Sequence, residues 1–188
     1  MKNAIAIAGG IATGKSSAVK LLIERGFDAI DADQIARERF YEQAKTIEAV
    51  FGALDRATIA ARIFSDKAER KKLEDILHPL IRETIFTKSE ELERLGRRYF
   101  IDIPLFFENR ASYPISDVLL IYAPRATQIQ RLIRDRKMSE ADANARVGAQ
   151  IPIDDKQKAA TWIIRNDKDF DNLREQIERF VKTIQGGS

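Results

Sequence analysis

The segment that most constrains the fold lies near the N-terminus, where an apolar run passes through glycines into a helical pattern. Residues 4–8 read Ala-Ile-Ala-Ile-Ala, which is typical of a strand buried on both faces of a parallel sheet. Gly9 and Gly10 interrupt the run, and residues 15–22 have the composition of a helix. A strand, a glycine-rich loop and a helix in this order predict an α/β fold.

The spacing of the glycines suits the binding of a phosphate chain. Gly9, Gly14, Lys15 and Ser16 fit the P-loop pattern G-x-x-x-x-G-K-S/T. Backbone N–H groups wrap closely around phosphates in such a loop, and the following helix directs its positive dipole end at the anion. We expect Lys15 to contact the β- and γ-phosphates and Ser16 to hold Mg²⁺. The alternative is a helix-capping turn in which the Lys-Ser pair occurs by chance.

Composition limits the class of protein and its partners. The chain has 188 residues, 44% hydrophobic and 32% charged, with a net charge of +3 and no cysteine. One core with small inserted subdomains is therefore expected, without disulfides or a cysteine zinc site. The mild positive charge suits an anionic small molecule, and we expect no nucleic acid or membrane partner. Residues 186–188, Gly-Gly-Ser, are expected to be flexible.

Two predicted strands end in acidic residues. A strand over 27–30 delivers Asp31 and Asp33 to the carboxyl end of the sheet, where ligands bind in open α/β folds. Asp33 either receives the proton of an acceptor hydroxyl or caps the following helix, and both interpretations stay open. A strand over 97–103 carries Asp102, which resembles a Walker-B acid that reaches Mg²⁺.

The region 34–97 is helical almost throughout, which predicts an inserted helical subdomain because it is too long for a simple crossover. His78-Pro79 is expected to break or kink a helix. His78 is the only histidine, and substrate contact suits it better than proton transfer. Expected N-caps are Asp55, for a helix over 56–64, and Ser65 or Asp66, for a helix over 67–77.

The second half of the chain predicts two further strands, over 117–122 and 160–164, and a closing amphipathic helix over 170–184. A basic helix over 125–136 places Arg131, Arg134 and Lys137 on one face, where a solvated surface is the ordinary expectation. Beyond it, Ser139 and Asp154 are expected to cap two short helices that contain few large apolar residues. We therefore expect a weakly anchored lid there.

The order of these motifs resembles the dephospho-CoA kinase family nearly from end to end. Apart from the P-loop each motif is weak alone, but their joint order is specific. The quoted residues are the loop 9–17, Asp31-Ala32-Asp33 with Ile35-Ala36-Arg37, Leu77-His78-Pro79, Ile103-Pro104-Leu105-Phe106-Phe107-Glu108, Gln130-Arg131 to Arg136, and Arg146 to Gln150 followed by Lys156.

The resemblance implies a P-loop NTPase-type five-stranded parallel sheet flanked by helices. The nucleotide-binding core would comprise residues 1–33, 98–136 and 157–188, with a helical acceptor-binding subdomain over 34–97 and a lid over 137–156. The implied reaction is ATP-dependent phosphorylation of the ribose 3′-hydroxyl of dephospho-CoA, which gives CoA and ADP with Mg²⁺. It is the last step of coenzyme A biosynthesis, expected here in the cytoplasm and from a monomer or weak oligomer.

The resemblance also implies roles for residues. Asp33 would activate the acceptor, and Arg146, with Arg136 as a second candidate, would steady the transferring phosphoryl group. Asn166 would lie near the adenine, and Ser16 and Asp102 would serve the metal. Dephospho-CoA would contact Arg37, His78 and Leu105. ATP would contact Gly9, Ala12, Thr13, Gly14, Lys15, Ser16 and Ser17.

The sequence departs from the family pattern at three places. Ala12 stands where glycine is common, and its Cβ is tolerable if its φ is negative. Ser17 stands where threonine is usual. The segment between Phe40 and Asp55 is shorter than usual and lacks a Pro-Gly loop, which concerns acceptor binding more than the chemistry.

Three rival functions share parts of this pattern. The nearest is another small-molecule P-loop kinase, for a nucleoside, nucleotide or sugar acid, against which the helical insertion and His78-Pro79 argue. A GTP-dependent switch would need D-x-x-G and N-K-x-D runs, which the sequence lacks. A non-catalytic nucleotide-binding module is disfavoured by Lys15, Ser16 and Asp33.

Overall fold

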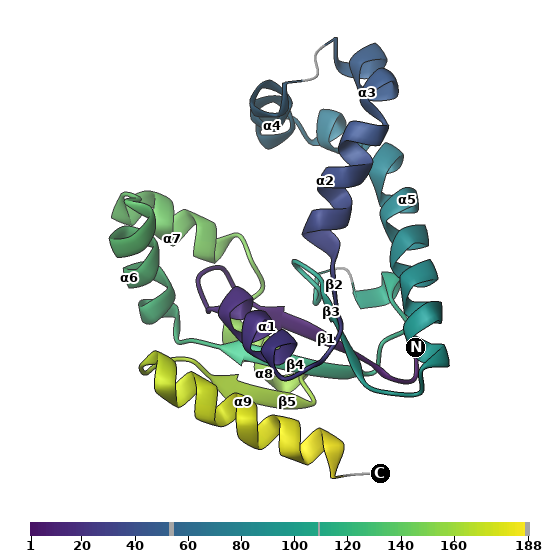
Figure 1. Ribbon diagram of the computed structural model, residues 1–188. Coiled ribbons are helices and arrows are strands. Elements are labelled where there is room, and N and C mark those ends of the chain that lie inside the picture. The colour runs from purple at the N-terminus through teal and green to yellow at the C-terminus, as the bar shows by residue number, and fades with distance from the viewer. Residues whose placement is uncertain (53–54, 109, 187–188) are drawn as a thin grey trace. The chain divides into compact units, whose positions relative to one another are not determined.

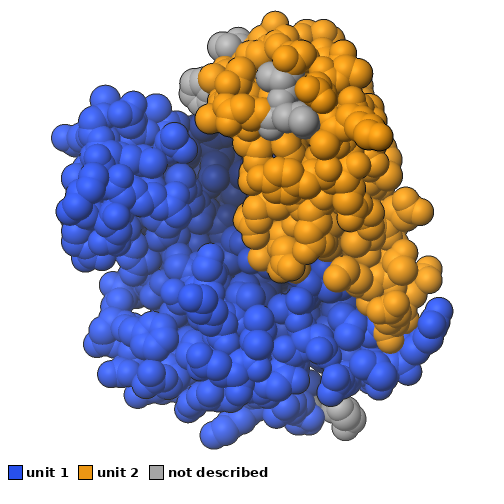
Figure 2. Space-filling view, turned by 45° about the horizontal axis from the view of Figure 1, so that its top comes forward, with its two compact units in different colours: residues 1–30, 92–188 blue, residues 31–91 orange. Residues whose placement is uncertain are grey.

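The computed structural model describes residues 1–52, 55–108 and 110–186. The prediction of a flexible tail therefore falls largely on residues outside this part. The chain divides into two compact units, shown in different colours in Figure 2: Met1–Ile30 with Leu92–Ser188, and Asp31–Glu91.

The first unit is built on a five-stranded sheet. Its strands are β1 (Ala4–Gly9), β2 (Ala29–Asp31), β3 (Tyr99–Asp102), β4 (Asp117–Tyr122) and β5 (Trp162–Arg165), in the order β2-β3-β1-β4-β5. β1 is central and pairs in parallel with both β3 and β4, and β4 pairs in parallel with β5. The predicted parallel sheet is confirmed: β4 has the predicted bounds, and the ends of the other strands differ from the predicted ones by at most two residues.

One face of the sheet is covered by α1 (Lys15–Glu24) and α9 (Phe170–Gln185), which lie beside each other in Figure 1. The apolar stripe predicted for the last helix is buried there. Alternate residues of the strands face the same core because side chains alternate along a strand. The buried core consists of Ile5, Ile7, Ala18, Leu21, Leu22, Phe100, Leu119, Ile121, Ile164, Leu173, Ile177, Phe180 and Val181.

Three helices lie between β4 and β5 in the chain: α6 (Arg125–Arg136), α7 (Glu140–Gly148) and α8 (Ile153–Lys158). A short 3₁₀ turn, Arg110–Ser112, precedes β4. The Ser139 hydroxyl accepts a hydrogen bond from the Asp142 N–H, which confirms the predicted cap of α7. The predicted cap at Asp154 is wrong: α8 begins at Ile153 without a side-chain cap, and Asp154 instead accepts a hydrogen bond from the Tyr122 hydroxyl at 2.9 Å.

The weak anchoring expected for the lid does not extend to α8. Ile153 is 6% exposed and Lys156 only 1%. The charged end of Lys156 is compensated, because its Nζ lies 2.9 Å from Glu108 Oε1. A lid over the whole of 137–156 therefore stays a proposal, and within it α8 is packed into the first unit.

The second unit contains α2 (Ala32–Glu42), α3 (Ala44–Phe51), α4 (Arg56–Ser65) and most of α5 (Lys67–Arg94). Asp55 caps α4 as predicted. The Asp66 carboxylate accepts hydrogen bonds from the Ala68 and Glu69 N–H groups at the start of α5. The side chain of Ser65, the other candidate, lies outside the described part. The small core comprises Phe40, Ile47, Phe51, Ile59 and Leu77.

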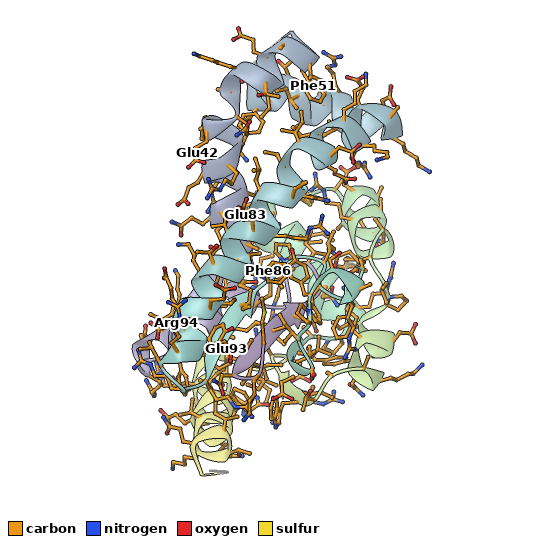
Figure 3. All side chains as sticks on the ribbon, turned by 90° about the vertical axis from the view of Figure 1, so that its right-hand side faces the viewer. Glu42, Phe51, Glu83, Phe86, Glu93 and Arg94 are labelled. Carbon is orange, nitrogen blue, oxygen red and sulfur yellow. The ribbon has the colours of Figure 1, made fainter. Side chains whose placement is uncertain are left out.

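Of the break or kink predicted at His78-Pro79, the break is wrong, because α5 continues through Pro79, and the kink stays a prediction. A proline inside a helix costs about 3 kcal/mol or more. Apolar packing on both sides of the proline opposes this cost, since Leu73 and Ile81 pack against the core and Ile85 is fully buried. Figure 3 shows the helix continuing from Glu83 past Phe86 to Arg94. No helix within the described residues is long and apolar enough to span a bilayer.

Candidate nucleotide-binding site

The predicted phosphate loop forms the turn between β1 and α1. Gly14 is the N-cap of α1 with φ +87°, a left-handed conformation that side chains rarely adopt. A Cβ at Gly14 would lie 2.1 Å from Nδ2 of Asn166, and a Cβ at Gly9 would lie 2.6 Å from Oγ1 of Thr13. The packing of the protein itself therefore requires glycine at both positions.

The loop is braced by Thr13 and Asn166. The buried Thr13 donates hydrogen bonds to the Gly10 carbonyl from its N–H, at 3.3 Å, and from its hydroxyl, at 2.9 Å. Asn166, which follows β5 and is 8% exposed, donates from Nδ2 to the Thr13 carbonyl at 2.8 Å. The structure thus gives the Asn166 amide a partner in the loop, and its contact with adenine stays a prediction.

The φ of Ala12 is +59°, whereas a Cβ at this position was expected to be tolerable only with a negative φ. A left-handed conformation costs a residue with a Cβ about 1–2 kcal/mol. Arg131 opposes this cost from α6: its Nη1 donates to the Ala12 carbonyl at 3.2 Å and its Nη2 to the Asn166 carbonyl at 2.8 Å. Burial lowers the pKa of the Arg131 guanidinium, with the nearby Arg134 as a second cause.

Lys15 and Asp102 meet at the carboxyl ends of neighbouring strands. The Lys15 ammonium forms an ion pair with the Asp102 carboxylate, and their side chains are 19% and 12% exposed. The parallel register places Asp102 opposite Ile7 of β1, at the end of the strand that leads into the loop. This edge, at the carboxyl ends of the parallel strands β1 and β3, is the usual ligand-binding position in open α/β folds.

The residues at this edge fit a magnesium–nucleotide complex rather than a resident metal. No group of three or more His, Asp or Glu side chains within the described residues could hold a metal ion. Ser16 is exposed in the first turn of α1 and Asp102 lies beside Lys15. Mg²⁺ bound with a nucleotide typically takes one or two protein oxygens, and phosphates and waters complete its shell.

The predicted acceptor-side residues Asp33, Arg37 and His78 all belong to the second unit, where each is exposed. Asp31, not Asp33, caps α2, since its carboxylate accepts a hydrogen bond from the Gln34 N–H at 2.9 Å. The capping interpretation of Asp33 is therefore wrong. Asp33 lies in the first helical turn, two residues beyond the end of β2.

The remaining predicted residues lie in the first unit. Arg136 and Arg146 are exposed in the last turns of α6 and α7. Leu105 is 41% exposed and has φ +53°. Ser17 is half-buried in the first turn of α1, and its N–H donates to the Gly14 carbonyl at 3.0 Å.

The basic face predicted on α6 divides into separate environments. Arg134 pairs with Asp135 at 2.6 Å at the surface, whereas Arg131 turns inward to the loop. Gln128 and Leu132, three residues before and one residue after Arg131, are both buried, and only the folded structure shows that this side of α6 faces inward. Sequence reasoning also assigned no role to Gln150, whose Oε1 accepts a hydrogen bond from the Ile11 N–H at 2.9 Å.

Comparison with known proteins agrees with this geometry. The family model CoaE, described as dephospho-CoA kinase, matches residues 3–172. A dephospho-CoA kinase from Helicobacter pylori is 44% identical over 193 residues, which cover 98% of each chain. The solved dephospho-CoA kinase from Campylobacter jejuni is 30% identical, with a TM-score of 0.78 over 99% of each chain.

A shikimate kinase from Acinetobacter baumannii shares the fold alone, with 16% identity and a TM-score of 0.55 over 99% of this chain and 94% of that one. The likeness in sequence to dephospho-CoA kinases, by contrast, extends over nearly the whole chain. The chain belongs to the dephospho-CoA kinase family.

Proposed function

We propose that this chain transfers the γ-phosphoryl group of ATP to the ribose 3′-hydroxyl of dephospho-CoA, with CoA and ADP as products. The observation that carries the proposal is the end-to-end relationship to dephospho-CoA kinases, 44% identical over 98% of both chains. The phosphate loop, with Lys15 beside Asp102, supplies the machinery that such a transfer needs.

Binding of ATP begins at the loop. Backbone N–H groups and the N-terminus of α1 surround the phosphates, and the Lys15 ammonium neutralises the β- and γ-phosphates. Ser16 and Asp102 would hold Mg²⁺, which supplies further charge neutralisation when it accompanies ATP. Lys15 pairs with Asp102, so its charge is directed to this edge of the sheet.

Phosphoryl transfer has a loose transition state, so that positioning and charge neutralisation dominate catalysis. We assign proton acceptance from the 3′-hydroxyl to Asp33, a contribution of roughly 10²–10⁴-fold. Arg146, or Arg136 in its place, would stabilise the transferring group, which is worth about 10³–10⁵-fold. Arg37, His78 and Leu105 are proposed to contact dephospho-CoA, and Asn166 the adenine of ATP.

A panel of acceptors tests the proposed function. With Mg-ATP, the protein should release ADP in proportion to added dephospho-CoA and show little turnover with nucleosides, nucleotides, shikimate or sugar acids. Preference for one of those acceptors would replace the assignment with another small-molecule kinase.

The variant Asp33→Asn tests the proposed base in the same assay. It should bind ATP normally and lose at least about tenfold in kcat, because the proton acceptor is removed. Asp31→Asn is the matched control, since asparagine caps a helix about as well as aspartate. Equal turnover of Asp33→Asn and the wild type would leave Asp33 without a catalytic role.

The cytoplasmic location and the monomeric or weakly oligomeric state stay predictions.

A further inference from the structure

A glutamine from outside the loop motif contacts the phosphate loop directly. Gln150 lies between α7 and α8, and its Oε1 accepts a hydrogen bond at 2.9 Å from the N–H of Ile11, 139 residues earlier in the chain. A Cβ at Gly10 would lie 3.5 Å from the same oxygen and 2.7 Å from Oε1 of Gln128. Two glutamine side chains therefore lie close against Gly10.

The backbone next to Gln150 is anchored to the body of the first unit. The Ile151 N–H donates to Glu108 Oε1 at 3.2 Å, and the same oxygen lies 2.9 Å from Nζ of the buried Lys156. Lys156 is 1% exposed, and a buried ammonium is costly without its partner. The Glu108–Lys156 pair thus holds the turn that presents Gln150.

Gln150 and Arg131 each hold one peptide group of the loop, and the Ile11–Ala12 peptide lies between these two groups. Gln150 accepts from the Ile11 N–H, and Arg131 donates to the carbonyl of Ala12, whose left-handed conformation is costly. The two contacts fix the orientation of the Gly10–Ile11 and Ala12–Thr13 peptides. A loop whose N–H groups are already oriented loses less conformational freedom when a phosphate chain binds.

We propose that Gln150 is a positioning residue for ATP, which holds the first half of the phosphate loop in its nucleotide-binding conformation through the Ile11 N–H. This inference rests on the proposed function, because it takes ATP as the ligand of the loop. The competing role is that of a placeholder. In that role Gln150 accepts the hydrogen bond of the Ile11 N–H only until a phosphate oxygen displaces it. The anchored turn favours positioning, and the two roles predict opposite changes in affinity.

Calorimetric titration of ATP without acceptor distinguishes the two roles. Gln150→Met keeps the length of the side chain but removes the acceptor oxygen, and Gln150→Ala removes both. Loss of one neutral hydrogen bond should weaken ATP binding by about 3- to 10-fold in each variant. The KM for ATP should rise by a similar factor while kcat changes less than twofold. Gln130→Ala, an exposed glutamine of α6, is the control and should bind like the wild type.

Hydrogen exchange of the Ile11 amide provides a second readout, since Gln150→Met should accelerate it while the Gly52 amide, which donates to the Glu48 carbonyl, stays unchanged. Equal ATP affinity of Gln150→Met and the wild type would overturn the proposal. Tighter binding by Gln150→Met would also overturn it and establish the placeholder. Failure of the wild type to bind ATP would refute the proposed function instead.

Discussion

At the scale of single residues, the phosphate loop contains two left-handed conformations, at Gly14 and at Ala12. The residue type explains the conformation of Gly14 but not that of Ala12. Gly14 satisfies both a φ of +87° and the close approach of Asn166. Ala12 has φ +59° with a Cβ, and its cost is offset by the hydrogen bond from Arg131. The loop therefore depends on α6 as well as on its own motif.

Ala12→Gly should stabilise the protein by up to about 1.5 kcal/mol. Relief of about 1–2 kcal/mol of strain exceeds the extra unfolded-state entropy of glycine, about 0.4–1 kcal/mol. Urea unfolding curves measure the difference. Ala141→Gly on the exposed face of α7 is the control and should cost about 1 kcal/mol. A loss of stability in both variants would contradict the strain assigned to Ala12.

At the scale of elements, two helices are held by contacts that their own sequences do not specify. α5 continues through Pro79 because apolar side chains pack on both sides of it. α8 has only six residues and no side-chain cap, yet its Lys156 is buried against Glu108. Tertiary packing, rather than propensity, supplies most of the stability of such helices.

Glu108→Gln should lower the free energy of unfolding by about 3 kcal/mol, because it leaves the buried Lys156 ammonium without a counter-charge. The double variant Glu108→Leu with Lys156→Met should recover most of that loss. Lys158→Met, which removes the exposed partner of Asp155 on the same helix, should leave the urea midpoint unchanged. Equal effects of Glu108→Gln and Lys158→Met would argue against a structural role for the buried pair.

At the scale of the whole molecule, the chain comprises a sheet unit that contains the phosphate loop and a helical unit inserted between β2 and β3. The residues assigned to ATP lie in the sheet unit. The proposed base and two acceptor contacts lie in the helical unit. Each unit has its own apolar core, so that the nucleotide site can be perturbed without altering the core of the other unit.

ATP at a hundred times its Kd should stabilise the wild type by about 2.7 kcal/mol, measured as a shift in thermal or urea unfolding. Gly14→Ala should abolish this shift, because its Cβ would lie 2.1 Å from Asn166 Nδ2 and its φ is left-handed. Gly26→Ala is the matched control: its φ is +86° but no atom lies within 4 Å of the added Cβ. It should lose some stability to strain and still respond to ATP.

The sequence by itself determined the features whose causes are local. The strand, glycine loop and helix at the N-terminus follow from residues within one short segment. The caps at Asp55 and Ser139 follow from a side-chain oxygen that reaches an N–H three residues on. The stripe of α9 follows from helical periodicity. Gly26, with φ +86° after the end of α1, also has a local cause, because glycine adopts the left-handed conformation that commonly ends a helix.

Only the tertiary structure decided the features that depend on distant partners. In the folded chain Asp31, and not Asp33, caps α2. The helix α5 continues through Pro79, and Lys156 is buried. The tertiary structure also surrounds the opening loop with Asp102, Gln150, Arg131 and Asn166, which are 87, 139, 119 and 153 residues from their partners in the loop. Local periodicity contains no information on such pairings, because they form only when the sheet and its helices pack together.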